Sequence, residues 1–457
     1  METATVRKLL ESFIFRYRQR TPKSGEHHLR CSRVSPGGVN SNLRAWEPYP
    51  VYFVRAKGSR IWDLDGNEYL DCAAAQGVLV VGHRNPKVLK AVRRQLELGT
   101  VNGASHAAEV ELCELILDRY PCHDQVRLTN TGSEAVAHAV RLARAATCRS
   151  LIIKAEGTYH GNYDPLMVSF TPGLEEAGPP NKPNRVPVTA GLTMGSIQDT
   201  FVVSYNDSEA LERCLAEQTG RVAAVILEPV VLNMGCTPPR PGYLQKVRDL
   251  CNRHGVLLIF DEAKSGGKIA YGGGPEYSGV KPDITCLAKA IGGGFPLGAI
   301  AASRELMELI ASGTVWQTGS FAANPVSVAA GIATLRDVLR KEVYPPLFRL
   351  NHQLAEGYRS VIQRHRIPAC VQTAGVTGAV FFTKGPVYNY RDACQASLSA
   401  FMVYWYGMLE RSVIPQSYGR DDAWTLTLFH GRKEINTILE ALDELAPQIA
   451  SIQEEGT

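Results

Sequence analysis

The sequence lacks any apolar run long enough to cross a bilayer, which takes roughly 18 to 20 residues. It also lacks a strong excess of charge, because 49 basic and 45 acidic side chains leave a net charge of +4 over 457 residues. So small a surplus argues against a nucleic-acid-binding or membrane-surface protein. Both classes are therefore excluded from the expectations below.

Paired cysteines are also missing. The 11 cysteines are odd in number and scattered singly, and no C-x-x-C pair occurs. A reduced, intracellular setting fits this pattern better than a disulfide framework or a zinc site. The basic first 20 residues could form an amphipathic helix, but they carry Glu2 and Glu11 and have no secretory apolar core. We predict a cytoplasmic protein, with an organellar presequence as the alternative.

What is present is an ordinary globular composition, with 45% hydrophobic and 21% charged residues, which excludes disorder or a coiled coil for the whole chain. The length is several times that of a usual domain, so we expect a large domain with a smaller one attached. We predict that residues 81–340 form the large domain. The small domain would combine an N-terminal segment, 1–80, with a C-terminal one, 341–457.

Within 81–340, short apolar runs alternate with stretches of helical period, which favours an α/β fold with a mostly parallel sheet between helices. The predicted strands are VRLTN (126–130), LIIKA (151–155), VAAVILEP (222–229), VLLIFDE (256–262) and GAIAAS (298–303). Asp65 and Gly66 predict a hairpin between two short apolar runs. The Pro- and Gly-rich stretch 172–187 is expected to be a long loop.

The segment Thr131-Gly132-Ser133-Glu134 lies between a predicted strand and a predicted helix. Glycine permits close approach of a ligand, and free N–H groups at a helix N-terminus attract anions such as phosphate. An ordinary helix cap, with a hydroxyl residue followed by glutamate, explains the same residues. Both interpretations stay open on this segment alone.

Two charged residues stand in apolar surroundings. Asp261 ends a predicted central strand, where ligands of open α/β folds bind, and burying its carboxylate requires a cationic partner. No His/Asp/Glu cluster with ligand spacing accompanies it, so we expect no metal. Lys289 lies in DITCLAKAIGGG, where burial would lower its pKa and free its amine to form an imine. The alternative is a lysine that reaches the surface from a strand end.

The motifs TGSE, EGTYHG, ILEP, FDE, LAKAIGGG and QTGSFAANP follow one another in this order. Together they resemble the class III aminotransferases of the fold-type I pyridoxal-phosphate enzymes, and most of all the glutamate-1-semialdehyde aminomutase-like subgroup. The resemblance runs from SPGGVNSNLRAW to the C-terminus. It implies a large domain with a mostly parallel central sheet between helices, a smaller α+β domain, and a homodimer with shared active sites.

The resemblance also implies roles at the cofactor ring. Lys289 would hold pyridoxal phosphate as a Schiff base and move a proton between substrate and cofactor, with a pyridoxamine intermediate. Asp261 would pair with the ring nitrogen, and Tyr159 would stack on the ring. His160 would support them from next to the site.

Further roles concern the phosphate and the outer part of the site. Thr131, Gly132 and Ser133 would supply phosphate donors, and Ser320 would reach the phosphate of the neighbouring subunit. Glu228 and Asn233 would lie close to the cofactor, Asn233 near the ring hydroxyl. For Glu228, an ion pair that stabilises the fold is the alternative.

For the substrate, the resemblance gives Arg44 as a carboxylate-binding residue, and a planar guanidinium suits a carboxylate. The alternative is an arginine exposed in a polar loop. The late segment SYGRDDAWTLTLFH carries Arg420 and two aspartates but no glutamate, whereas an aminomutase has a glutamate in this region, and Lys268 replaces an expected arginine. The Pro-rich loop also departs from the aminomutase pattern. These departures favour transamination from an amino acid donor to a carboxylate-bearing keto or aldehyde acceptor. An intramolecular aminomutase is the alternative.

Overall fold

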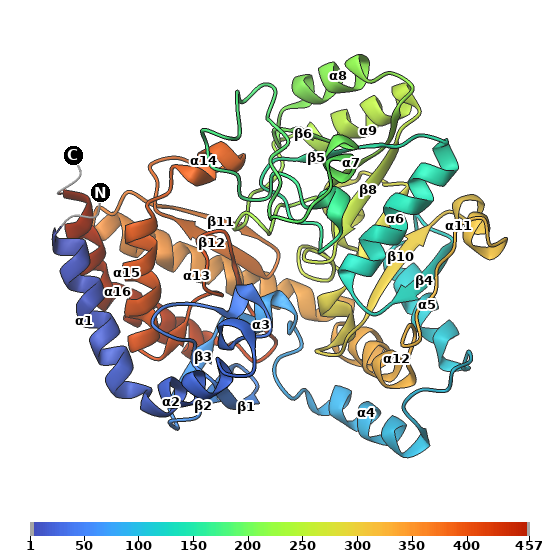
Figure 1. Ribbon diagram of the computed structural model, residues 1–457. Helices are drawn as coiled ribbons and strands as arrows, with labels where there is room; N and C mark the ends of the chain where they lie inside the picture. Colours follow the sequence, from blue (N-terminus) through green and yellow to red (C-terminus); the bar gives the residue numbers. More distant parts are fainter. Residues whose placement is uncertain (1–3, 455–457) are drawn as a thin grey trace. The chain divides into compact units, whose positions relative to one another are not determined.

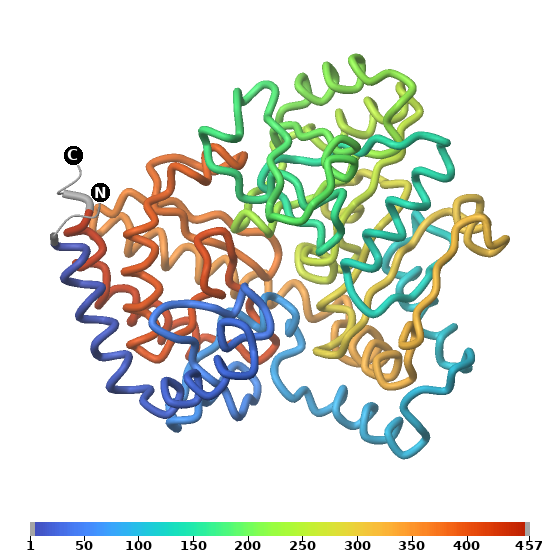
Figure 2. The backbone as a smooth tube through the Cα atoms, in the orientation of Figure 1, coloured from blue at the N-terminus to red at the C-terminus, as the bar shows by residue number. Residues whose placement is uncertain are grey.

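The computed structural model describes residues 4–454, and Glu2 lies outside them. The chain divides into two compact units (Figure 1, Figure 2). The larger unit comprises residues 86–344 and a short segment, 387–394, that joins it from late in the sequence. The other described residues form the smaller unit.

A seven-stranded sheet is the centre of the larger unit, with the strand order β4-β10-β9-β8-β7-β5-β6. Its strands are β4 (Gln125–Thr129), β5 (Leu151–Ala155), β6 (Thr200–Val203), β7 (Val222–Leu227), β8 (Leu257–Glu262), β9 (Ile284–Leu287) and β10 (Gly298–Ala302). Pairing is parallel from β6 through β9, whereas β10 is antiparallel to both β9 and β4. The predicted α/β fold with a mostly parallel sheet is confirmed.

Helices cover both faces of this sheet because its strands are apolar on both sides (Figure 1). Successive residues of β5 show this, since Ile152 packs in a cluster with α6 while Leu151 and Ile153 pack in a cluster with α8 and α9. The helices are α4 (Pro86–Leu98), α5 (Ala108–Arg119), α6 (Gly132–Thr147), α7 (Met194–Gln198), α8 (Ser208–Glu217), α9 (Tyr243–His254), α10 (Gly273–Ser278), α11 (Arg304–Ala311), α12 (Pro325–Ile332) and α14 (Tyr390–Cys394). Shorter helical turns are η3 (Asp164–Leu166), η4 (Lys289–Gly292), η5 (Ala333–Val338) and η6 (Lys341–Val343).

The smaller unit contains two sheets, ordered β1-β2-β3-β13 and β11-β12-β14. Its strands are β1 (Phe53–Lys57), β2 (Arg60–Asp63), β3 (Glu68–Asp71), β11 (Cys370–Ala374), β12 (Thr377–Phe381), β13 (Val413–Ile414) and β14 (Trp424–Thr425). Its helices are α1 (Ala4–Arg20), α2 (Pro22–Cys31), η1 (Pro36–Gly38), η2 (Asn42–Arg44), α3 (Ala74–Gly77), α13 (Tyr344–Arg364), α15 (Leu398–Glu410) and α16 (Arg432–Glu454). The predicted hairpin at Asp65 and Gly66 is present between β2 and β3. Among residues 4–454, no helix is both long and apolar enough to span a membrane.

Candidate active site

The candidate residues of the larger unit follow strands that end at one edge of its sheet. β5, β7, β8 and β9 run parallel, and β4 shares their direction because it is antiparallel to β10, which is itself antiparallel to β9. The carboxyl ends of these strands therefore meet at the same edge, where open α/β folds bind ligands. The predicted residues that follow these ends are Thr131, Gly132, Ser133, Tyr159, His160, Glu228, Asn233 and Lys289, and Asp261 is the last residue but one of β8.

Asp261 and His160 form a buried pair. His160 donates from Nδ1 to Oδ2 of Asp261 over 2.7 Å, and the two residues are 1% and 3% exposed. The other oxygen of Asp261 accepts from the backbone N–H of Ala263 at 3.0 Å. Burial is the main cause that lowers the pKa of His160, although Asp261 opposes it. A neutral ring that donates from Nδ1 holds the Asp261 carboxyl group in a fixed orientation.

Tyr159 lies half-buried beside this pair. Its hydroxyl donates to the side chain of Asn162 at 2.9 Å, and its ring centroid is 5.1 Å from that of Phe170. Its carbonyl accepts a hydrogen bond from the amide of Asn233 at 3.3 Å. Burial raises the pKa of the Tyr159 phenol, with Asp261 as a second cause, so the side chain stays protonated at neutral pH.

The segment Thr131–Glu134 is a helix cap, as one of its two interpretations predicted. Thr131 is the N-cap of α6 and accepts from the N–H of Glu134 at 3.1 Å, while Glu134 accepts from the N–H of Asn130 at 2.7 Å. This reciprocal pair leaves the first N–H groups of the helix, at Gly132 and Ser133, without intrahelical acceptors. The cap and the anion site are therefore compatible at this helix end.

Gly132 joins this helix end to the strands that carry Asp261 and Lys289. A Cβ added at Gly132 would lie 3.0 Å from the Cβ of Ala263 and 3.2 Å from that of Ala288. Ala263 is two residues after Asp261, and Ala288 directly precedes Lys289. The N-terminus of α6 thus packs on two alanines that lie close in sequence to Asp261 and Lys289, and a residue larger than glycine would push the helix away from them.

Ser133 connects the same helix end to the turn that carries Tyr159 and His160. Its hydroxyl oxygen accepts from the N–H of Asn162 at 3.1 Å. Gly161 has a φ of +86°, and a Cβ there would lie 2.4 Å from the Ser133 hydroxyl. Glycine is therefore required at position 161 both for its backbone conformation and for this contact.

Lys289 follows β9 at the start of η4, and it is half-buried between two buried alanines. Its φ is +51°, in the left-handed region that non-glycine residues seldom adopt. Such strain is found preferentially at functional positions, where the surrounding structure holds the residue in place. The intermediate exposure lies between the two expectations of a fully buried and a surface lysine.

Glu228 and Asn233 lie in the segment after β7. Glu228 is 1% exposed and accepts from the N–H of Leu232 at 3.1 Å. Burial is the main cause that raises the pKa of Glu228 to about 7, and Asp261 adds to it. Asn233 reaches Tyr159, as described above, so this segment supports the turn that follows β5.

Ser320 does not join these residues. It is exposed and lines a separate open cavity of about 610 Å³ in the larger unit, together with residues 101–105, 317–319 and 322–325. None of Lys289, Asp261 or Tyr159 lines this cavity. The structure thus leaves the predicted role of Ser320, in a neighbouring subunit, as a prediction.

Arg44 and Arg420 both belong to the smaller unit. Arg44 ends η2 and is exposed, whereas Arg420 is half-buried and donates to the carbonyl of Ala396 at 3.1 Å. Their loops touch, because the ring of Trp46 lies 6.2 Å from that of Tyr418. Each arginine is two residues from one of these rings, so the two loops form one surface.

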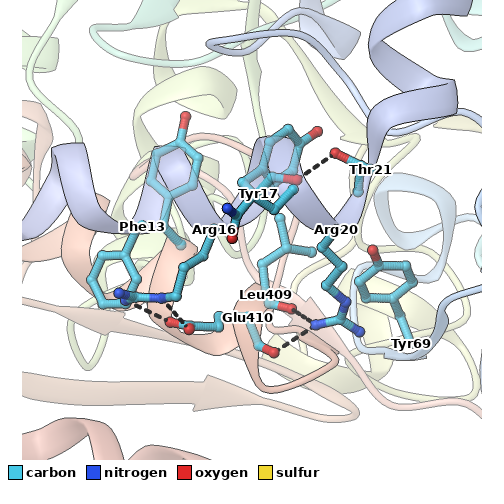
Figure 3. A pocket seen from close by; sticks show the side chains of 10 residues that line it. Phe13, Arg16, Tyr17, Arg20, Thr21, Tyr69, Leu409 and Glu410 are labelled. Atoms are coloured by element: carbon cyan, nitrogen blue, oxygen red, sulfur yellow. Dashed lines mark hydrogen bonds and ion pairs between the residues drawn. The ribbon is translucent and has the colours of Figure 1, made fainter.

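The smaller unit has a cavity of its own, of about 340 Å³, which lies between α1, β3 and α15 (Figure 3). Arg16 is paired there with Glu410, and Arg20 donates to the carbonyls of Leu409 and Glu410. No predicted site residue lines this cavity, and both of its arginines are already engaged. We do not assign it a catalytic role.

Sequence reasoning missed Lys154, which is completely buried in β5. Its ammonium donates to the carbonyls of Thr158 at 2.7 Å and Val168 at 2.6 Å, so it holds both sides of the turn that carries Tyr159. Burial is the main cause that lowers its pKa to about 7. The signal was the single lysine within the apolar run LIIKA.

Sequence reasoning also gave no role to Glu262, the neighbour of Asp261. Glu262 is completely buried and accepts from the N–H of Gly274 at 2.7 Å and the hydroxyl of Tyr120 at 3.4 Å. Burial is the main cause that raises its pKa to about 8. This carboxyl is therefore largely protonated at neutral pH.

Replacing Glu262 with glutamine should flatten the pH dependence of stability. The folded-state pKa of about 8 exceeds the unfolded value of 4.5, so the folded chain binds the extra proton between these limits. The stabilisation that the protonated Glu262 carboxyl gives is fully present below about pH 4.5, and it is lost as the pH rises through 8. Glutamine cannot ionise, so Glu262→Gln should gain a few kcal/mol relative to wild type between pH 5 and pH 9.

Thermal melting across this pH range checks the Glu262 prediction. Glu305→Gln, which changes an exposed carboxylate, is the matched control and should run parallel to wild type. Glu228 and Lys154 titrate in the same range, with opposite signs, so only the difference between variant and wild type is informative. Parallel curves for Glu262→Gln and wild type would contradict the prediction.

With this geometry in place, comparison with known proteins identifies the family. The class-III aminotransferase family matches residues 43–404. The chain belongs to the class-III aminotransferase family. It is an enzyme of this pyridoxal-phosphate-dependent family. Within residues 4–454, no group of three His, Cys, Asp or Glu side chains could hold a metal ion.

Among its relatives is the glutamate-1-semialdehyde 2,1-aminomutase of Aquifex aeolicus, 38% identical over 93% of this chain and 100% of that protein. Among solved structures, an omega-transaminase from Sphaerobacter thermophilus has a TM-score of 0.87 and 32% identity, covering 94% of this chain and 98% of the other. A transaminase with pyridoxal phosphate bound has a TM-score of 0.85 and 29% identity, covering 95% and 99%. These matches confirm the resemblance and the fold-type I architecture. The aminomutase relative favours the alternative reaction over the transamination that the sequence departures suggested.

Proposed function

We propose that this chain binds pyridoxal phosphate at the carboxyl edge of its larger sheet and moves an amino group on a carboxylate-bearing small molecule. The packing of Gly132 against Ala263 and Ala288 carries the proposal, because it brings a helix N-terminus to the alanines that lie two residues after Asp261 and directly before Lys289. A phosphate, a ring nitrogen and an aldehyde are the groups that these three features suit.

The residues fit the cofactor chemically. Gly132 and Ser133 offer backbone N–H groups for the phosphate, and the Ser133 hydroxyl keeps its own proton to donate, since it accepts from Asn162. Asp261 is a charged carboxylate held by His160, suited to a protonated ring nitrogen. When bound, pyridoxal phosphate supplies an aldehyde for amines and a ring that withdraws electrons from the substrate carbon.

The chain's own groups have separate tasks in this proposal. The amine of Lys289 holds the cofactor and then carries a proton to and from the substrate carbon. Asp261 keeps the proton on the ring nitrogen, and His160 keeps the Asp261 carboxylate oriented. Tyr159 would stack on the ring, and Asn233, which donates to the carbonyl of Tyr159, would lie near the ring hydroxyl. Thr131 caps α6 and so fixes the phosphate donors, while Glu228 supports the same segment as Asn233.

For the substrate carboxylate we propose Arg44 and Arg420. The contact between Trp46 and Tyr418 supports this, because it gathers both guanidinium-bearing loops onto one surface of the smaller unit. A guanidinium binds a carboxylate through two parallel hydrogen bonds. Arg44→Ala should raise the Michaelis constant for the substrate more than Arg33→Ala, which changes another exposed arginine of the same region.

We further propose a homodimer in which Ser320 serves the partner's site. Ser320 lines an open cavity, and the neighbouring Phe321 and Trp316 are 62% and 72% exposed. Large apolar side chains gathered on one surface mark an interaction site. A second copy of this chain is the occupant we expect, and the mass of the purified chain in solution tests it.

Two reactions use this chemistry. The full-length aminomutase relative favours transfer within one molecule, and we take this as the first candidate. The second candidate is transamination between an amino acid donor and a keto or aldehyde acceptor. Arg420, Lys268 and the Pro-rich loop favour it, as does the omega-transaminase with 32% identity.

A single-substrate assay separates the two reactions. Purified, cofactor-loaded chain is incubated with glutamate-1-semialdehyde alone, and products are followed by mass spectrometry and proton NMR. An aminomutase converts it to the isomer that carries the amino group on carbon 1 and the carbonyl on carbon 2, and forms no second product. Turnover that requires a separate amino acceptor would replace the first candidate with the second. Lys289→Ala is the control for uncatalysed isomerisation.

A further inference from the structure

The segment 387–394 comes late in the chain but belongs to the larger unit. Its short helix α14 lies beside the Pro-rich loop, as the orange turn and the green loop of Figure 2 show. The segment is anchored at its start, because the carbonyl of Tyr388 accepts from the amide of Asn206 at 2.8 Å and the guanidinium of Arg240 lies 4.6 Å from the Tyr388 ring. It is thus a fixed element against which a loop can be held.

Arg391 makes four hydrogen bonds from this segment. Its Nε and Nη2 donate to the two carboxylate oxygens of Glu156 at 2.8 and 2.9 Å, in a bidentate pair. The same guanidinium donates to the carbonyls of Ala177 at 3.0 Å and Gly178 at 2.9 Å. The side chains of Arg391 and Glu156 are only 16% and 1% exposed, so little water competes for the pair.

Tyr390 makes a second connection between the same elements. Its hydroxyl donates to the carbonyl of Pro172 at 2.7 Å, at the start of the Pro-rich loop. Its ring lies on Gly157, where an added Cβ would be 2.6 Å from Cδ2 of Tyr390. Gly157 has a φ of +78°, so glycine is needed there for the backbone as well as for the ring.

Glu156 and Gly157 begin the turn that carries Tyr159 and His160. The chain just before the Pro-rich loop is bonded to this turn, because the N–H of Gly157 donates to the carbonyl of Ser169 at 2.9 Å. Phe170, the next residue, packs on the ring of Tyr159. Movement of the Pro-rich loop would therefore shift the contacts that hold Tyr159 and His160 in place.

We propose that Tyr390 and Arg391 are positioning residues that hold the 156–161 turn and the Pro-rich loop, 172–187, in one arrangement. In this arrangement Tyr159 and His160 are fixed before the cofactor arrives. Neither positioning residue needs to contact the cofactor or the substrate. The part of the proposal that concerns the cofactor rests on the proposed function, whereas the part that concerns the loop does not.

Hydrogen exchange tests the loop directly, in the full chain without added cofactor. Arg391→Gln removes the bidentate pair with Glu156, and we expect amide exchange of residues 172–187 to become at least about 10-fold faster. Lys182→Gln is the matched control, because Lys182 pairs with Glu217 at the exposed side of the same loop. This control should stay within about twofold of wild type. Unchanged exchange in Arg391→Gln would overturn the proposal, even if the chain binds no cofactor.

Titration with pyridoxal phosphate tests the effect on the site, using the visible absorbance of the bound cofactor. We expect the dissociation constant to rise about 10-fold in Arg391→Gln and Glu156→Gln. It should rise less in Arg391→Lys, which keeps the positive charge but cannot form the bidentate pair. The double variant, Arg391→Gln with Glu156→Gln, should have a dissociation constant no higher than that of either single variant. Faster loop exchange with an unchanged dissociation constant would overturn the link to the cofactor. No binding by the wild type would instead contradict the proposed function.

Tyr390→Phe keeps the test valid if the arginine variants fail to fold. It removes one hydroxyl and leaves the ring on Gly157, and thermal melting checks that the chain stays folded. We expect exchange to rise about threefold at residues 171–174, close to the lost bond to Pro172, and to stay unchanged in α8. Equal exchange in Tyr390→Phe and wild type would overturn the role of Tyr390.

Discussion

Lys289→Ala should abolish amino transfer, with a loss of at least about 10⁴-fold in turnover. The amine of Lys289 both holds the cofactor and moves the proton, and removing such a general acid-base alone costs about 10²–10⁴-fold. The left-handed backbone at this position, with a φ of +51°, is held by the surrounding fold rather than by the side chain. Alanine should therefore leave the structure intact while removing the chemistry.

Two measurements check the Lys289 prediction apart from turnover. Borohydride reduction of the loaded wild type should fix the cofactor to the peptide that contains Lys289, as read by mass spectrometry. The variant should lose this adduct and the visible absorbance that accompanies it. Lys281→Ala, which removes an exposed lysine eight residues away, is the matched control and should behave as wild type. An adduct on another lysine, such as Lys268, would contradict the assignment.

The central strands could be read from the sequence because each is a continuous apolar run. LIIKA was predicted at its observed bounds, and the strands ending at Leu227 and Glu262 were within two residues of theirs. β6 and β9 were missed, since four residues with threonine or cysteine give no clear period. The antiparallel placement of β10 was also outside local reasoning, because strand direction depends on the path of the whole chain.

The candidate site was recoverable in part for the same reason. Asp261 and Lys289 stand out locally, since each is a charged residue beside an apolar run. The contact of Asp261 with His160 joins residues 101 positions apart, and no sequence spacing announces it. The pairing of Arg391 with Glu156 spans 235 positions, and although Glu156 begins the EGTYHG motif, nothing around Arg391 marks it as the partner. Contacts of this kind appear only once the chain is folded.

Asp261→Asn should lower turnover about 10²–10⁴-fold while changing the Michaelis constant little. Asparagine has nearly the same shape but no charge, so a protonated ring nitrogen would lose its counter-ion at a buried position. His160 would also face a neutral amide in place of the carboxylate that now accepts its Nδ1 proton at 2.7 Å. The loss should therefore fall on the chemical step rather than on substrate binding.

The neighbouring residue provides the control for Asp261. Glu262→Gln also neutralises a buried carboxyl of β8, but the raised pKa of Glu262, about 8, means that this group is already largely protonated at pH 6. At that pH the control should keep turnover within about threefold of wild type, while Asp261→Asn loses it. Equal losses in the two variants would show that any polar change at this strand end damages the site. A loss below about 10-fold in Asp261→Asn alone would remove Asp261 from the proposed chemistry, because a counter-ion for a buried cation must matter more than that.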